Sequence, residues 1–238
     1  MLTDNHSIII DYPIDYNKFP LAKKCEFMEI ELNEGEYVFI PENVLHWVFT
    51  DPYTIALSFS IKDIETNDIN DNLYNKIKRK IPYKEKGKKV SIDYKNFINT
   101  YQNENFTVLY SDGYDSSPVY KPYETCKKFF DNDKLINIIK KNKKYGYYSY
   151  VGQHKMKENF SFLKEIKNFI NIDDSLYLAY IPYLWLSINR PINSGLHSDA
   201  YDSLLYVLKG KKKVLLAKPN YEQYIYTSTL ERIPHKEE

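Results

Sequence analysis

Cysteine is scarce in this sequence, and long apolar runs are absent. The two cysteines, Cys25 and Cys126, are too few for a disulfide framework and lack metal-ligand spacing, which favours a reducing compartment. No apolar run approaches the roughly eighteen residues of a membrane span. The N-terminus has no basic segment followed by an apolar core, so export is not indicated either. We expect a cytoplasmic protein without a membrane partner, and a nuclear location stays open.

Net charge is also nearly absent. The 238 residues include 33 basic and 32 acidic side chains, which gives a formal charge of +1. No overall field therefore points to nucleic acid or to an acidic substrate. Because a chain of this length can bury one sizeable core, we expect a single domain over residues 1–238.

The N-terminal quarter has the sequence pattern of β-strands. Apolar and polar residues alternate over residues 28–32 and 55–61, and residues 37–40 form an apolar run. Turn residues fill the intervening segments 33–36 and 41–43. The pattern predicts consecutive antiparallel strands with one buried face.

The periodicity weakens over residues 62–105, where charge dominates, and we interpret this stretch as a connector. Its run from Lys76 to Lys89 holds eight basic residues and one acid. A solvated helix or loop explains that run more simply than a phosphate-contacting patch does. Residues 122–144 and 158–170 have the apolar spacing of amphipathic helices, with a strand expected over 147–151 between them.

Turn residues at 189–195 form a loop that leads to His197. Beyond the loop, apolar runs at 204–208 and 214–217 are separated by Lys209-Gly210-Lys211. This spacing predicts a tight β-hairpin, with His197 and Asp199 at its mouth.

His197 and Asp199 are the clearest chemical signal in the chain. Residues i and i+2 of an extended segment share a face, so the two side chains can reach one point while Ser198 faces away. An imidazole nitrogen and a carboxylate oxygen are two of the three ligands in the facial triad that binds non-haem Fe(II). His46, which follows the turn at 41–43, is the candidate for the third ligand.

Both ends of the chain resemble the Jumonji C and related cupin-type 2-oxoglutarate oxygenases, including the asparaginyl hydroxylases. The stretch from Gly35 to His46, with Ile40-Pro41 and a histidine five residues after the proline, is similar to the distal-histidine motif of that family. The proximal half of the same domain is matched by Ser194-Gly195-Leu196-His197-Ser198-Asp199, Leu204, Gly210, Lys212 and Pro219.

This resemblance implies a mainly β fold with flanking helices (α+β), built on a double-stranded β-helix of the cupin or jelly-roll kind. It implies Fe(II) held by His197, Asp199 and His46, with 2-oxoglutarate as cosubstrate and O₂ as oxidant. The chain would then be a 2-oxoglutarate-dependent dioxygenase, a hydroxylase.

The resemblance also implies residues for the cosubstrate. Lys212 matches the lysine that pairs with the far carboxylate of 2-oxoglutarate, and Ser194 matches a hydroxyl residue that assists it. Tyr150 is similar to the family tyrosine that contacts the same carboxylate. A dianionic keto acid inside a barrel needs a fixed cation and donors to offset its lost hydration.

The order of the two halves departs from the family. The distal half occupies residues 1–61 and the helices with the His-x-Asp half occupy 106–238, whereas the family usually has the His-x-Asp half first. Counting from His197 through the C-terminus and on from Met1 to His46 gives 87 residues, a separation of the size that the family has. A circular permutation is therefore predicted. A homodimer in which His46 of one protomer completes the site of another is the alternative.

Each of these residues also has a simpler interpretation. A His-x-Asp pair is usually structural, His46 could be an interior histidine bonded to backbone, and Lys212 could lie in a solvated turn. Strand alternation, however, sends Lys212 to the face opposite its two lysine neighbours. Tyr150 lies among several tyrosines, and Ser194 could be a plain loop serine.

The function expected from the resemblance is hydroxylation, or demethylation, of a protein side chain. A modified RNA base or a methylated lysine is a further substrate option, and the sequence does not choose among them. One alternative is a non-catalytic cupin-like module for binding or assembly. Another is a cupin metalloenzyme that does not use 2-oxoglutarate, which Lys212 and Asp199 disfavour.

Overall fold

The computed structural model describes residues 6–8, 13–61, 80–87, 91–111, 119–120, 128–145, 148–155, 183–217, 221, 224–225, 227–229 and 231–232. Strands form most of this part of the chain, as the sequence predicted. Its helices are a short 3-10 helix at Pro20–Lys24 and two α-helices, α2 (Tyr94–Tyr101) and α3 (Leu135–Tyr145). No described helix combines the length and the apolar character that crossing a bilayer requires.

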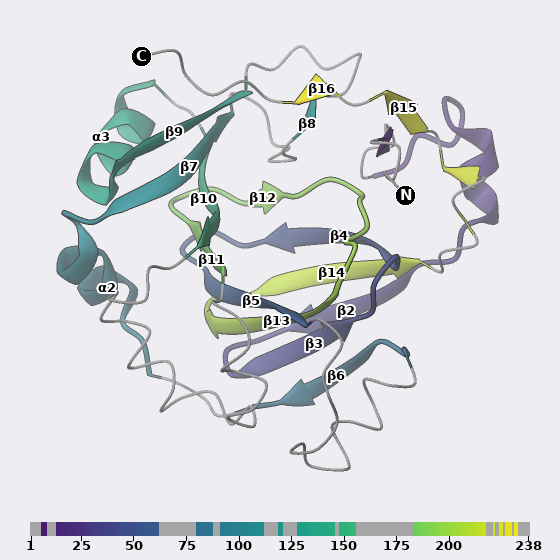
Figure 1. Ribbon diagram of the computed structural model, residues 1–238, viewed down its shortest axis with the longest axis horizontal. Coiled ribbons are helices and arrows are strands. Elements are labelled where there is room, and N and C mark those ends of the chain that lie inside the picture. Colours follow the sequence, from purple (N-terminus) through teal and green to yellow (C-terminus); the bar gives the residue numbers. More distant parts are fainter. Residues whose placement is uncertain are drawn as a thin grey trace.

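Two antiparallel sheets make up the body of the molecule (Figure 1). The larger sheet has the order β6 (Tyr83–Lys86), β3 (Glu36–Ile40), β13 (Asp202–Lys209), β5 (Ile55–Ile61), β11 (Tyr183–Ser187), β10 (Tyr148–Lys155), β7 (Asn105–Ser111) and β9 (Lys128–Lys134). The smaller sheet has the order β12 (Ile192–Asn193), β4 (Leu45–Thr50), β14 (Lys212–Ala217) and β2 (Met28–Leu32). Two further pairs join β1 (His6–Ile8) to β15 (Thr227–Thr229) and β16 (Glu231–Arg232) to β8 (Val119–Tyr120).

In two runs of the chain, successive strands lie in opposite sheets. The strands β2, β3, β4 and β5 fall alternately in the smaller and the larger sheet, and β12, β13 and β14 do the same. The predicted strand positions at 28–32, 37–40 and 55–61 are confirmed, but the strands β2 to β5 do not pair with their neighbours along the chain. This alternation is the connectivity of a jelly roll, the fold class that the sequence predicted.

The predicted hairpin around Gly210 is wrong for the same reason. Strand β13 pairs with β3 and β5, whereas β14 pairs with β2 and β4. The turn does reverse the chain, and Gly210 has a φ of +82° that favours glycine. A turn signal indicates a change of direction but does not say whether the next strand pairs with the previous one or crosses to the facing sheet.

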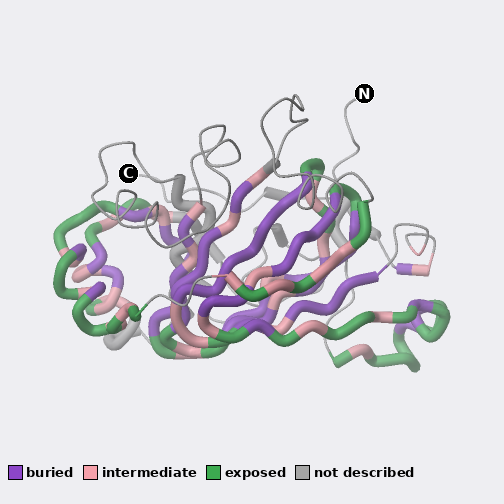
Figure 2. Tube along the Cα trace, turned by 90° about the horizontal axis from the view of Figure 1, so that it is seen from below, coloured by how far each residue is buried: buried purple, intermediate pink, exposed green. Residues whose placement is uncertain are grey.

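The larger sheet is buried on both faces, which corrects the expectation of one buried face. The outward side chains of β5 and β13 pack against α2, α3 and β7 in one apolar cluster. The inward ones, such as Ala56, Leu205 and Val207, pack with Val214 and Leu216 of the smaller sheet in a second cluster. Figure 2 shows buried residues running along the central strands. The space between the sheets is therefore lined by alternate residues of the central strands.

The helix predicted over residues 122–144 is confirmed for 135–144 and wrong for 128–134, and residues 122–127 lie outside the described residues. Residues 128–134 form β9, in which Phe129 and Phe130 pair with Tyr110 and Leu109 of β7. Helix α3 begins at Leu135, after Asp133 has accepted a hydrogen bond from the backbone N–H of Lys134. The apolar spacing of the two phenylalanines fits a strand as well as a helix, so periodicity alone could not place the boundary. The strand expected over 147–151 is confirmed by β10, and the helix expected over 158–170 lies outside the described residues.

The stretch interpreted as a connector is partly built into the fold. Strand β6 extends the larger sheet beside β3, and α2 begins at Asp93, whose side chain accepts a hydrogen bond from the backbone N–H of Asn96. Two lysines of the basic run form ion pairs, Lys80 with Asp202 at 2.5 Å and Lys84 with Glu36 at 2.8 Å. These pairs favour the structural interpretation of that run over a phosphate-contacting patch.

Candidate metal centre

His46 reaches the space between the sheets because of strand alternation. It is the second residue of β4, and Leu45 and Trp47 on either side of it pack into a cluster on the outer face of the smaller sheet. The imidazole is almost fully buried, with 3% of its residue surface exposed. Its Nδ1 donates to the carbonyl oxygen of Val44 at 2.9 Å. Because a carbonyl only accepts, this bond leaves Nε2 as the unprotonated nitrogen.

His197 is positioned by a loop that is bonded to the same strand. The two histidines form an isolated antiparallel bridge, with backbone N–H to O distances of 2.7 and 3.0 Å. Gly195, at a φ of +74°, turns the chain so that its carbonyl accepts from Nδ1 of His197 at 3.0 Å. Both histidines therefore have the same tautomer, in which Nε2 can bind a metal.

Asp199 is brought in by the continuation of this loop. Its backbone carbonyl accepts from the N–H of Asn43 at 2.8 Å. Only His197 forms a bridge, so the two residues do not lie in one regular strand as the spacing argument assumed. Their side chains nevertheless converge, because the loop is hydrogen-bonded to the His46 segment at two places, at His46 through His197 and at Asn43 through Asp199.

His46, His197 and Asp199 form a cluster that could hold a metal ion. Their ligand atoms all lie within 4.8 Å of one another, and Nε2 of His46 is 3.7 Å from Oδ2 of Asp199. The two imidazole rings are 4.1 Å apart between centroids. The convergence occurs within one chain, so no second protomer is needed to bring the three residues together.

The electrostatics of this cluster suit a divalent cation. Burial lowers the pKa of His46, and neighbouring His197 lowers it further, while the Asp199 carboxylate and the Val44 carbonyl oppose the shift. A neutral imidazole is the form that binds metal. Two imidazole nitrogens and one carboxylate oxygen are a donor set that fits non-haem Fe(II). The residues present therefore fit the group that the resemblance implies.

Lys212 lies at the start of β14 with its side chain directed inward, as alternation predicted. It is 3% exposed, whereas Lys211 is exposed and Lys213 is half-buried. Its Nζ donates to Oγ1 of Thr50 at 2.6 Å, and the two residues are also cross-strand neighbours. Burial lowers the pKa of Lys212 from 10.5 to about 7. The solvated-turn interpretation of this lysine is therefore excluded.

Ser194 also faces this region, but its hydroxyl has local partners. Its Oγ accepts from the N–H of Val48 at 3.1 Å and donates to the carbonyl of Gly195 at 3.2 Å. The backbone of Tyr150 lies in β10, opposite Ser187 of β11. The side chain of Tyr150 lies outside the described residues, so its predicted role stays a prediction.

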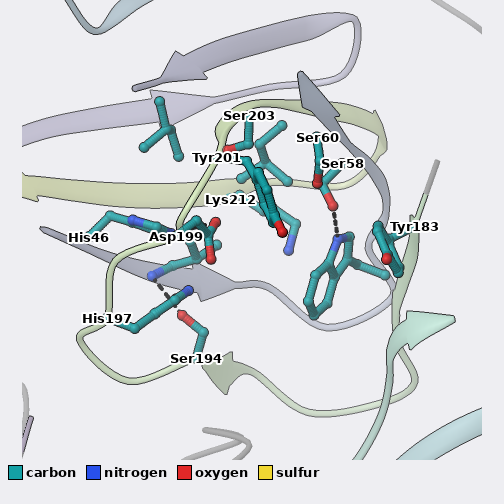
Figure 3. A pocket seen from close by; sticks show the side chains of 14 residues that line it. His46, Ser58, Ser60, Tyr183, Ser194, His197, Asp199, Tyr201, Ser203 and Lys212 are labelled. Carbon is teal, nitrogen blue, oxygen red and sulfur yellow. Dashed lines mark hydrogen bonds and ion pairs between the residues drawn. The ribbon is translucent and has the colours of Figure 1, made fainter. Parts of the chain in front are cut away.

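A cavity of about 260 Å³ joins these residues (Figure 3). The three candidate metal ligands, Ser194 and Lys212 all line it. Sequence reasoning missed its other walls, which are Ile40, Val48, Ser58, Ser60, Tyr183, Trp185, Tyr201, Ser203 and Leu205. The alternation of Ser58 and Ser60 with Leu57 and Phe59 was the available signal, because it places two hydroxyls on the inner face of β5.

A known protein family includes most of this chain. The family model for the cupin-like domain matches residues 77–238, more than half of the chain. The chain belongs to the cupin-like domain family. The match leaves out residues 1–76, so the place of His46 in the site rests on the geometry.

Three curated proteins named for JmjC domains are similar to this chain. A protein of Acanthamoeba polyphaga mimivirus is 26% identical over 237 residues, which covers 91% of this chain and 38% of that protein. JmjC domain-containing proteins C and D of Dictyostelium discoideum are 40% and 43% identical, over 26% and 20% of this chain and 15% and 10% of their own lengths. The chain thus spans less than half of each relative. No solved structure matches it significantly.

The mimivirus alignment bears on the order of the two halves. At 91% of this chain, it must run through both the His46 segment and the His197 segment. The same order therefore occurs in a longer relative. These findings place the chain among the JmjC and cupin-type proteins, as predicted, but they do not show a circular permutation.

Proposed function

We propose that this chain is an Fe(II)- and 2-oxoglutarate-dependent oxygenase that hydroxylates or demethylates a protein side chain. The observation that carries the proposal is the cluster of His46, His197 and Asp199 in one cavity with the buried Lys212. A keto acid bound to the cluster would extend into the cavity toward the ammonium group of Lys212. The JmjC names of the relatives support the same reaction class.

His46, His197 and Asp199 would hold Fe(II), and Lys212 with Ser194 would hold the far carboxylate of 2-oxoglutarate. Fe(II) bound there would let O₂, the oxidant, react with 2-oxoglutarate, so that one oxygen atom enters the cosubstrate on its decarboxylation and the other enters a substrate C–H bond. The carbonyls of Val44 and Gly195 keep both imidazoles in the metal-binding tautomer before any ligand arrives. This preorganisation lowers the cost of assembling the site.

Charge balance supports a dianionic cosubstrate in this cavity. A divalent metal with one carboxylate retains one positive charge, and protonated Lys212 adds a second. A dicarboxylate neutralises both, which offsets the cost of burying each group separately.

The substrate enters from the side of the metal cluster. The Asp199 side chain is 46% exposed, and so is the Tyr201 residue beside it, so solvent reaches the cavity there. A protein or peptide side chain is our proposed substrate, and RNA bases and methylated lysine are the competing classes. A cytoplasmic location and a homodimer stay predictions.

Anaerobic binding of Fe(II) and 2-oxoglutarate, followed by turnover of 2-oxoglutarate in the presence of O₂, tests the proposal. We expect wild-type protein to bind both and to consume 2-oxoglutarate slowly without substrate. The Asp199→Ala and His46→Gln variants should lose metal binding and turnover. Turnover that survived either substitution would refute the site. A protein that bound neither ligand would favour the non-catalytic cupin-like module.

A further inference from the structure

The hydroxyl group of Ser58 can still donate a hydrogen bond into the cavity. Its Oγ accepts a hydrogen bond from Nε1 of Trp185 at 2.7 Å. An indole N–H is only a donor, so this bond uses Ser58 as the acceptor and leaves its O–H available. Among the described residues, this hydroxyl makes no hydrogen bond as a donor. The bond from Trp185 thus fixes the orientation of the Ser58 oxygen, and the Ser58 proton points away from the indole.

Ser58 lies on the wall of the cavity opposite Lys212. Ser58 belongs to β5 of the larger sheet and Lys212 to β14 of the smaller one, and both line the cavity. In the view of Figure 3, Lys212 lies between the metal cluster and Ser58. An anion held by the lysine would therefore have the serine hydroxyl on its far side.

A buried carboxylate needs more donors than Lys212 can direct to it. The lysine already donates one N–H to Thr50. The two oxygens of a carboxylate accept several hydrogen bonds, and each bond left unmade where water is excluded costs free energy. The hydroxyl of Ser194, the other proposed contact, would have to give up its hydrogen bond to the Gly195 carbonyl in order to donate to the ligand. A second oriented donor is therefore required on the other side of the ligand.

We propose that Ser58, held by Trp185, donates a hydrogen bond to the far carboxylate of the 2-oxoglutarate that Lys212 binds. This inference rests on the proposed function and adds two residues to it. Ser58 is a cosubstrate-binding residue, and Trp185 is a positioning residue that acts through it. The pair selects ligands that have a second carboxylate at the correct distance from the metal-chelating end.

Calorimetric titration of anaerobic, Fe(II)-loaded protein with 2-oxoglutarate and, separately, with oxalate tests this role. Oxalate can chelate the metal but has no distant carboxylate. Ser58→Ala should raise the Kd for 2-oxoglutarate about 10- to 100-fold, the effect of one hydrogen bond to a charged group, and leave the Kd for oxalate unchanged. Ser60→Ala is the matched control, since Ser60 lines the same cavity two residues along β5.

Trp185→Phe separates positioning from direct contact. Without the indole N–H, the Ser58 hydroxyl can rotate, so 2-oxoglutarate binding should weaken less than in Ser58→Ala. The double variant should bind no more weakly than Ser58→Ala alone, because the indole acts through the serine. Additive losses would overturn the positioning role of Trp185.

The outcomes distinguish this inference from the proposed function. If wild-type protein binds 2-oxoglutarate and Ser58→Ala changes its Kd less than twofold, the role of Ser58 is wrong and the oxygenase proposal stands. An equal loss for oxalate and 2-oxoglutarate would also overturn it, because the substitution would then disturb the metal site. If wild-type protein binds oxalate but not 2-oxoglutarate, both proposals fail together.

Discussion

Lys212 is buried inside the barrel although its neighbours in the sequence are also lysines. Strand alternation predicted that it points inward although both neighbours are lysines, and the structure places it in the barrel with 3% exposure. A lysine kept out of water destabilises the folded state unless a partner compensates it. Its hydrogen bond to Thr50 compensates only in part, as the lowered pKa indicates. An anion bound beside Lys212, as we propose, would offset this cost.

Replacing Lys212 by methionine should stabilise the ligand-free protein. The lysine titrates near 10.5 when unfolded and near 7 when folded, so the unfolded chain binds more protons between these pH values. Wild-type stability should therefore rise as pH increases from about 7 to about 10.5, and the full penalty applies below pH 7. At pH 6, Lys212→Met should gain roughly 1–4 kcal/mol in urea unfolding and lose the pH dependence. Lys211→Met, at an exposed position, should change little. A destabilised Lys212→Met protein would contradict this account.

The same lysine should make 2-oxoglutarate binding pH-dependent. A bound carboxylate raises the pKa of Lys212 again, so binding above pH 7 takes up a proton. Affinity should then fall by up to about tenfold per pH unit above pH 7. Calorimetry in buffers of different ionisation enthalpy measures this uptake directly. Lys212→Arg, whose guanidinium stays charged, should show no uptake if it binds at all. Proton uptake that persisted in Lys212→Arg would assign it to another group.

At the scale of elements, the sequence located strands better than it paired them. Residues 28–32 and 55–61 form strands where alternation predicted them, since a side-chain period of two is a local property. Pairing is not local, because β14 joins β2 and β4 rather than the strand before it. The boundary of α3 at Leu135 was missed because Phe129 and Phe130 satisfy both periods. The first failure concerns which strands pair, and the second concerns the secondary structure of residues 128–134.

Gly210 lies in the crossing between the two sheets, and its replacement should be costly. Its φ of +82° is unfavourable for other residues, and a Cβ there would meet the side chain and backbone of Thr54. We expect Gly210→Ala to lower the free energy of unfolding by about 1–3 kcal/mol or more. It should also weaken 2-oxoglutarate binding, because Lys212 follows two residues later. Urea unfolding measures the first effect, with Lys211→Ala as the control. Unchanged stability would mean that this turn tolerates a side chain.

At the scale of the whole molecule, the site depends on two histidines that are 151 residues apart in sequence. Both histidine motifs were found from local residues and from resemblance, but their meeting was only a hypothesis. The structure brings His46 and His197 together through two backbone hydrogen bonds. Alternation indicated the face of Ser58, but the positions of Trp185 and Tyr183 beside it could not be predicted, because they depend on the register between β5 and β11. A sequence pattern indicates which face a residue occupies but not what lies opposite.

The order of the two halves leads to a prediction about connectivity. We propose that the domain is a circular permutant, and the pairing of β1 with β15 supports this, since it sets residues 6–8 beside residues 227–229. The test variant joins Glu238 to Met1 by a short Gly/Ser linker and has its new termini within residues 62–79. If the barrel does not depend on where the chain is cut, this variant should keep the barrel. We expect this variant to unfold cooperatively and to bind Fe(II) and 2-oxoglutarate within about threefold of wild type. A matched variant with the same linker, opened instead between Lys209 and Lys212, should lose binding, because that cut separates β13 from β14. Failure of the first variant to fold would show that the present order is needed to form the barrel, and the permutation proposal would be abandoned.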